Sequence, residues 1–271
     1  MTVRLLSLAT AAALLAGCST TPAKPVNKLL RDKQLAQDMA FAEYKDLNYK
    51  AAARNFQKTA DILNTLDDYH GEAADRHNQA RALQHDGQLD AAIATYQRAL
   101  AINRRLNQTA NQAQNLAGLA QCYEAQGRLP QAIEAAQHAL PLAATAKPIL
   151  QNDLAGFLIQ RNGPGDLVDA QKLLNATDLK LAITQLNLGR LALVAGKPAD
   201  AKPRLTQALE SFRGDENPHG IACAHEALAR CYAALGDTDA AQFHQQQARN
   251  KFSYLKIVPV DSRNKNGPSA P

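Results

Sequence analysis

The chain has 271 residues and a formal net charge of +5 at pH 7, and 46% of its residues are apolar but only 5% aromatic, with no tryptophan. The length allows a sizeable core, and the composition indicates an interior built from alanine and leucine. The basic residues form no dense cluster with interleaved aromatics, which argues against a nucleic-acid partner. Strand patterns are nearly absent outside residues 255–260, so the sequence predicts an all-α fold.

The N-terminal segment, residues 1–17, has the pattern of a secretory signal peptide. One basic residue, Arg4, precedes an apolar stretch that is too short to span a bilayer core of about 30 Å. The next segment, Leu15-Ala16-Gly17-Cys18, closely resembles the bacterial lipobox, whose cysteine is acylated and becomes the new N-terminus. The resemblance implies lipidation of Cys18. The alternative is an ordinary signal peptide followed by an incidental cysteine.

Acylation at Cys18 would hold the protein on a membrane, since each buried methylene contributes about 0.8 kcal/mol. Ser19 resembles the signal that sorts lipoproteins to the outer membrane. Residues 18–28 would then form a flexible tether. We therefore expect a protein that is lipid-anchored to the bacterial outer membrane and faces the periplasm.

The segment from Ala73 to Leu106 contains two amphipathic helical patterns that meet at Gly87, and the chain repeats this unit. The interval from Gly87 to Gly127 equals that from Gly196 to Gly236, which gives a 40-residue period. Similar small and large apolar residues surround each of these glycines. Counting one period back from Gly87 reaches Leu47, where the flanking pattern persists without the glycine. The period predicts repeated antiparallel helical hairpins.

These hairpins resemble the tetratricopeptide repeat family, whose pattern combines small residues, aromatics and a turn glycine at fixed offsets. The matching residues of the clearest repeat are Ala80, Leu83, Gly87, Ala92, Tyr96 and Ala99. The family period is about 34 residues, so the 40-residue units of this chain indicate a variant with longer helices. The resemblance implies a right-handed solenoid of about six units over residues 29–261.

The register slips in the middle of the chain. The interval from Gly127 to Gly196 is longer than one period and shorter than two. Pro141 and Pro148 are expected to end helices early, and an irregular fourth hairpin is assigned to residues 149–177. This hairpin is either a simple evolutionary irregularity of packing or a bend where a partner docks. Residues 262–271 are expected to be disordered.

Motifs for catalysis and metal binding are absent. The sequence contains no nucleophile elbow, phosphate-binding loop or zinc-protease motif, so we expect no catalytic residue and no cofactor. His219, Cys223 and His225 lie close in sequence, but a helix would turn His225 away from Cys223. No metal site is therefore expected. The cysteines after Cys18 are too far apart for a disulfide and are expected to be small buried residues. The alternative is a free thiol that pairs with a partner.

The family resemblance also implies a binding surface, because the first helix of each hairpin lines a concave groove. The residue after the small one would point into this groove, and asparagines there often hold a peptide backbone. Arginine can bind a carboxylate or a phosphate through two hydrogen bonds, so the groove would favour anionic peptides. The alternative is a solvated surface without a ligand. The candidate residues are Phe41, His77, Asn78, Arg81, Gln121, Asn187, Arg190, Glu226 and Arg230.

These features predict a non-enzymatic envelope scaffold or adaptor that binds proteins or peptides. Its layout resembles that of lipoproteins of type IV pilus assembly and of lipoproteins that recruit cell-wall hydrolases. One alternative is an envelope enzyme or an activator that binds peptidoglycan directly, which predicts a carboxylate of raised pKa in the groove. Another is an assembly subunit that associates with itself. The sequence leaves the partner and the oligomeric state open.

Overall fold

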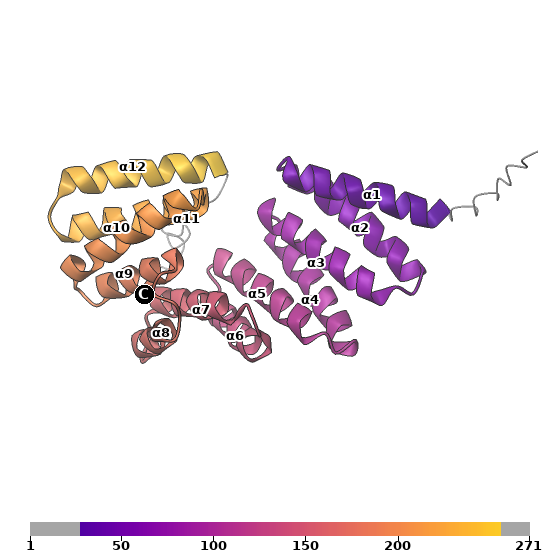
Figure 1. The fold of residues 1–271 in the computed structure, drawn as a ribbon, viewed down its shortest axis with the longest axis horizontal. Coiled ribbons are helices and arrows are strands. Elements are labelled where there is room, and N and C mark those ends of the chain that lie inside the picture. The colour runs from indigo at the N-terminus through magenta and orange to yellow at the C-terminus, as the bar shows by residue number, and fades with distance from the viewer. Residues whose placement is uncertain (1–27, 256–271) are drawn as a thin grey trace, which may run out of the picture.

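The computed structural model describes residues 28–255, which form twelve α-helices and one short 3-10 helix without a strand in this range. The all-α prediction is confirmed. Consecutive helices pack antiparallel in hairpins (Figure 1). The helices are α1 (Lys28–Lys45), α2 (Tyr49–Thr65), α3 (Tyr69–His85), α4 (Leu89–Arg105), α5 (Thr109–Ala125), α6 (Leu129–Ala139), α7 (Lys147–Arg161), α8 (Asp166–Asn175), α9 (Ala182–Val194), α10 (Pro198–Gly214), α11 (Pro218–Ala234) and α12 (Thr238–Leu255), and the 3-10 helix is η1 (Leu140–Leu142).

The 40-residue period arises from helices of 17 residues that short turns join. From α2 to α5 each helix has this length. The turns need one residue in the left-handed region, and Gly87 and Gly127 supply it at φ 77° and 74°. Leu47 occupies the equivalent position at φ 61° without the freedom of a glycine. The hairpin therefore imposes a left-handed backbone conformation at this turn position, and glycine adopts that conformation with the least strain.

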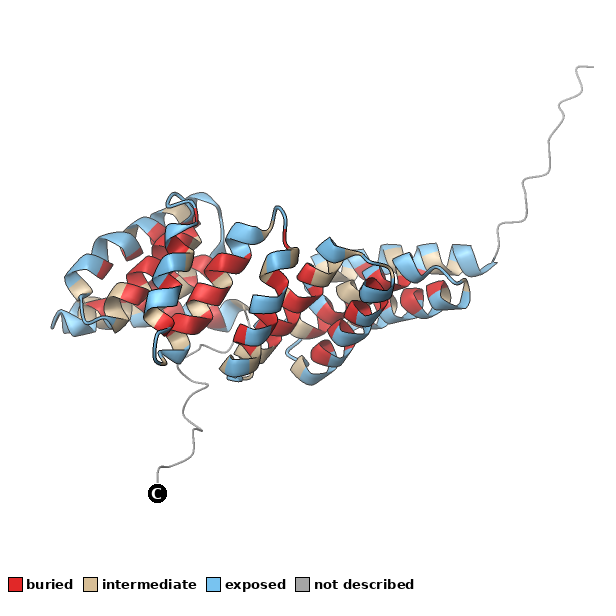
Figure 2. Ribbon diagram, turned by 90° about the horizontal axis from the view of Figure 1, so that it is seen from below, coloured by how far each residue is buried: buried red, intermediate tan, exposed pale blue. Residues whose placement is uncertain are grey.

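The interior is built from alanines that let the helices approach closely. Ala80, Ala92 and Ala99 are all fully buried, as the spacing of small residues predicts. Tyr96 of α4 fills the space between α4 and α5 at 1% exposure and lies against Gly118 of α5. In Figure 2 the buried residues concentrate on the sides of the helices that face one another.

The hairpins form an arc in which the odd-numbered helices lie on the inside. Figure 1 shows α3, α5 and α7 nearer the middle of the arc than α4, α6 and α8. Side-chain hydrogen bonds join successive odd-numbered helices. Gln37 Nε2 of α1 donates to Asp75 Oδ1 of α3 over 3.3 Å, and His77 Nδ1 of α3 lies 2.9 Å from Asn115 Oδ1 of α5. The odd-numbered helices are therefore joined by polar side-chain contacts as well as by apolar packing.

The fourth hairpin is shortened. The helix α6 stops at Ala139, and η1 follows at Pro141. The helices α7 and α8 have 15 and 10 residues, compared with 17 in the regular repeats. The expectation that Pro148 ends a helix is wrong, because Pro148 lies in the first turn of α7, where a missing N–H costs little.

The apolar core divides beside this hairpin. One cluster extends from Ala40 to Leu191, and a second, from Ala182 to Cys231, belongs to α9, α10 and α11. Between α7 and α9 lie buried polar groups that we call the seam: Asn152, Thr177, Thr184 and Asn187. Asn152 Nδ2 donates to Thr184 Oγ1 over 3.1 Å, and Asn187 Nδ2 donates to the Asn152 carbonyl over 2.9 Å. Directional hydrogen bonds thus connect the two cores.

Several sequence predictions fall outside the described residues. Cys18, the tether up to residue 27 and the tail at 262–271 lie there and stay predictions. Within residues 28–255, no helix has the length and apolar character needed to cross a membrane.

Candidate functional site: the inner face of the odd-numbered helices

Five of the predicted groove residues lie on the inner helices with accessible side chains. Arg81 of α3, Gln121 of α5 and Arg230 of α11 are exposed, and Arg190 of α9 and Glu226 of α11 are half-buried. They come from four hairpins that are distant in the sequence. The repeat register alone brings them to one side of the arc.

Arg81 is held by an aromatic group at the N-terminal end of this face. Its guanidinium carbon lies 5.5 Å from the centre of the Tyr44 ring, a cation–π distance. His85, one turn after Arg81, stacks on Tyr49 with ring centres 4.9 Å apart. Removal from water, followed by the charges of Arg81 and His219, lowers the pKa of His85. The side chains of this corner are thus fixed in place, and a preorganised surface binds with less loss of entropy.

A chain of hydrogen bonds runs along the middle of the face. The Tyr96 hydroxyl donates to Gln84 Oε1 over 2.9 Å, and Gln84 Nε2 donates to Gln121 Oε1 over 3.2 Å. Gln121 Nε2 donates in turn to Asp153 Oδ2 of α7 over 3.5 Å. Burial raises the pKa of Asp153 to about 6, with Glu124 adding to the rise and the Gln121 amide opposing it. Gln121 is therefore oriented from both sides.

Charged side chains on different inner helices influence one another. The charge of His219 on α11 lowers the pKa of His85 on α3. Glu124 on α5 raises the pKa of His219 and of Asp153 on α7. These pairs relate α11 electrostatically to α3 and α5 across the arc. The face carries cationic side chains and carboxylates together, and the preference for anionic peptides stays a prediction.

Three of the predicted residues serve the protein's own structure. Asn187 is 2% exposed, and its amide donates to Asn152, which leaves it no access to a bound peptide backbone. His77 is half-buried between Asn115 and Tyr96, and burial is the main reason that its pKa is lowered. Phe41 is exposed, but its ring packs edge-on against Phe56 at 5.1 Å. Asn78 is half-buried on α3.

Sequence reasoning missed several residues of this face. His85 lies four residues after Arg81, and Glu124 lies three residues after Gln121. Residues three or four positions apart share one face of a helix, so both could have been predicted from Arg81 and Gln121. Asp153 carried no such signal, because the shortened hairpin breaks the register. From the sequence, His219 and Cys223 are considered only as metal ligands, and no site is expected there.

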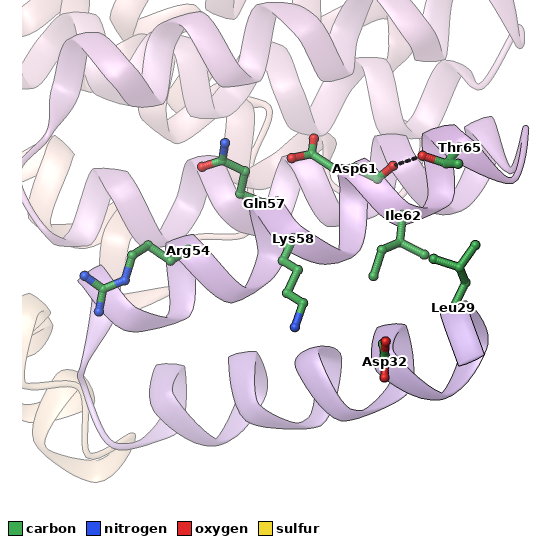
Figure 3. Close-up of a pocket in the computed structure, with 8 residues that line it drawn as sticks. All are labelled: Leu29, Asp32, Arg54, Gln57, Lys58, Asp61, Ile62 and Thr65. Atoms are coloured by element: carbon green, nitrogen blue, oxygen red, sulfur yellow. Dashed lines mark hydrogen bonds between the residues drawn. The ribbon is translucent and has the colours of Figure 1, made fainter. Parts of the chain in front are cut away.

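The described residues hold no cluster of three or more histidine, cysteine or acidic side chains suited to a metal ion. A hollow of about 550 Å³ lies elsewhere, between α1 and α2. Figure 3 shows Lys58 and Ile62 of α2 projecting toward α1, with Leu29 opposite Ile62. The hollow has mixed charge, lies at one end of the arc and shares no residue with the inner face.

Comparison with protein families gives a decisive match. The tetratricopeptide repeat model matches residues 74–145 and 180–252, which together make up more than half of the chain. The chain belongs to the tetratricopeptide repeat family. The two matched stretches flank the shortened hairpin, so the repeat pattern is lost where the register slips. No curated protein matches the sequence significantly.

Solved structures share the fold at low sequence identity. The apo form of RapI is similar with a TM-score of 0.69 at 11% identity, over 86% of this chain and 87% of that one. The Rap conjugation gene regulator of plasmid pLS20, in complex with the Phr* peptide, has a TM-score of 0.60 at 12% identity, over 95% and 84%. A tetratricopeptide repeat protein from Parabacteroides merdae has 0.55 at 14%, over 87% and 94%. At these identities the similarity supports the fold alone.

Proposed function

We propose that this chain is a non-enzymatic adaptor that binds a protein or peptide partner on the inner face of its odd-numbered helices. The observation that carries the proposal is the line of side-chain hydrogen bonds that joins the inner helices α3, α5 and α7, which Arg190 on α9 and Arg230 on α11 continue along the arc (Figure 1). Repeat families use such surfaces for extended partners. The structure of the pLS20 Rap regulator with the Phr* peptide is a peptide complex of a similar fold.

The partner's chemistry follows from the charges of the face. Arg81 and Arg190 can each hold a carboxylate, whereas Asp153 and Glu124 lie between them along the arc. A uniformly acidic peptide would meet these carboxylates and be repelled. We therefore propose a partner segment with acidic groups near its ends and a polar or basic middle. Membrane anchoring through Cys18 and a role in an envelope machine, such as a pilus or a hydrolase complex, belong to the same proposal.

A charge-reversal variant tests the inner face. Arg81→Glu/Arg190→Glu/Arg230→Glu is expected to reduce recovery of a discrete partner from crosslinked bacterial envelopes by at least about tenfold. One charge-assisted hydrogen bond contributes about 1.5–3 kcal/mol, and about 1.4 kcal/mol corresponds to a factor of ten. Quantitative mass spectrometry of the captured proteins measures the change.

The matched control is Arg54→Glu/Arg98→Glu/Arg249→Glu, which makes the same change of net charge on exposed positions of the even-numbered helices α2, α4 and α12. It should capture the partner at the wild-type level. Loss of the partner in the control but not in the inner-face variant would move the binding surface to the outer helices. Loss in neither variant would contradict charge recognition altogether.

A second candidate function has one observation in its favour. The raised pKa of Asp153 is the feature expected of an envelope enzyme or an activator that contacts peptidoglycan. Neither the hollow between α1 and α2 nor the smaller one lined by Tyr69 and Ile102 includes Asp153. Binding of purified peptidoglycan that is lost in Asp153→Asn would favour this function over the adaptor.

A further inference from the structure

The three cysteines of the described chain have different surroundings. Cys122 and Cys231 are fully buried, and burial raises the pKa of both thiols, that of Cys122 to about 12. Cys231 also donates its S–H to the Pro198 carbonyl over 3.3 Å. Such thiols are inert. Cys223 differs from both, because it is partly exposed on the inner face.

Cys223 is paired with a histidine. It lies in the second turn of α11, and its Sγ is 3.9 Å from Nε2 of His219, one turn earlier. The charge of Arg190 on α9 also acts on Cys223 and lowers the pKa of its thiol, and Glu226, in the next turn of α11, opposes it. Beyond His219 lie Glu124 and His85. Two basic side chains from different helices thus act on one partly exposed cysteine.

The electrostatic balance favours the thiolate. Burial raises the pKa of the Cys223 thiol, but contact with His219 and the charge of Arg190 lower it by more, and the net pKa lies below that of an ordinary cysteine. Contact with the Cys223 sulfur is also the largest cause of a raised pKa at His219, with Glu124 contributing and Arg190 opposing. Both shifts favour the thiolate–imidazolium pair relative to the neutral pair.

We propose that Cys223 and His219 form a thiol–disulfide exchange site on the inner face, which accepts small or peptide-borne disulfides. The Cys223 thiolate attacks one sulfur of the disulfide, a new S–S bond forms to Sγ, and the original S–S bond breaks. The departing sulfur leaves as a thiolate, which His219 can protonate. Cys223 is oxidised and the departing sulfur is reduced, so no other oxidant is needed. This activity goes beyond adaptor binding and needs no partner protein.

The test follows exchange with a pyridyl disulfide on the full chain carrying Cys18→Ala, so that every remaining thiol lies in the described residues. We expect one thiol per folded chain to react, with the adduct on Cys223 by peptide mass spectrometry. The reaction should begin at a lower pH than that of an ordinary thiol, whose pKa is about 8.5. Cys223→Ser should abolish the fast phase, and Cys122→Ala should leave it unchanged.

Two substitutions show whether His219 acts on Cys223 through its positive charge or only supports the local structure. His219→Gln should slow exchange near pH 6 by about tenfold and move the midpoint of the pH profile toward that of free cysteine, whereas His219→Lys should restore much of the rate. Circular dichroism checks that the variants stay folded. The proposal would be overturned if the pH profile of the wild type had its midpoint near about 8.5, the pKa of an ordinary thiol. It would also be overturned if Cys122 and Cys231 of the folded chain were labelled as fast as Cys223. Neither result would bear on the adaptor function.

Discussion

Replacing Gly118 by alanine is expected to lower the free energy of unfolding by about 1–3 kcal/mol, the usual cost of overfilling a packed core. A Cβ atom at Gly118 would lie 2.3 Å from Cζ of Tyr96. Tyr96 cannot retreat easily, since it is 1% exposed and its hydroxyl donates to Gln84. The helices α4 and α5 would have to separate. The midpoint of urea unfolding, followed by circular dichroism, measures the loss.

Gly156 provides the control, because it also lies inside a helix but has room. Its added Cβ would meet only Asn187, with Oδ1 at 3.6 Å, an ordinary contact. Gly156→Ala is therefore expected to stabilise the chain by about 0.5–1 kcal/mol through helix propensity. If the penalty at Gly118 reflects the Tyr96 contact, it should shrink in a Tyr96→Leu background. A penalty of the same size in both backgrounds would contradict this explanation.

Acidification is expected to destabilise the last hairpin through His225. This side chain is 1% exposed, and its Nδ1 lies 2.8 Å from Nδ1 of His244 on α12. Burial, together with the charges of His244, Lys251 and Arg213, lowers the pKa of His225 to about 4. Burial and Arg213 also lower the pKa of His244, whose ring stacks on Tyr232.

The direction of the effect follows from proton binding. The unfolded chain binds a proton at His225 near pH 6.5, but the folded chain does so only near pH 4. The stability that neutral His225 contributes to the folded chain is therefore fully present above about pH 6.5. It is lost as the pH falls toward about 4, by up to about 1.4 kcal/mol per pH unit. The protection factor of the α12 amides, which is the intrinsic exchange rate at each pH divided by the measured rate, should therefore fall between about pH 6.5 and pH 5.

The variant that checks this prediction is His225→Gln, which can still donate a hydrogen bond to His244. Its stability should fall less on acidification than that of the wild type. Comparing the two chains is necessary because burial raises the pKa of Asp75 and Asp153, which stabilises the folded chain in acid and acts in the opposite direction. Parallel pH profiles for wild type and His225→Gln would rule out this histidine as the cause.

The hairpin architecture could be predicted from the sequence because its signals are local. The turn at Gly87 and the buried Ala80 and Ala92 belong to one unit, and the 40-residue period repeats them. The turn at Leu47, which has no glycine, could also be predicted by counting one 40-residue period back from Gly87. The Asp68 cap was also predictable, since its side chain accepts from the backbone N–H of Gly71 three residues later.

The candidate site was harder to predict, because its residues meet through tertiary structure. The family pattern assigned Asn187 to the groove by its repeat position, but the shortened hairpin sets Asn152 against it and buries both. Asp153 follows Asn152 and became part of the inner face by the same irregular packing. The His225–His244 pair links two helices across a turn, and no periodicity predicts the contact. The repeat pattern could not predict side-chain contacts where the register of the repeats changes.

The seam between the two cores has a mechanical consequence. A solenoid pulled from its two ends carries the load through its hairpins in series, so its weakest junction yields first. Apolar contacts weaken gradually as surfaces separate, but the hydrogen bonds from Asn152 and Asn187 are lost within about an ångström of displacement. The arc should therefore resist small forces stiffly and then open abruptly between α7 and α9. Leu188 and Leu191 of α9 would separate from the first cluster while the second cluster stays intact, so the protein would lengthen in a step with most of each core still packed.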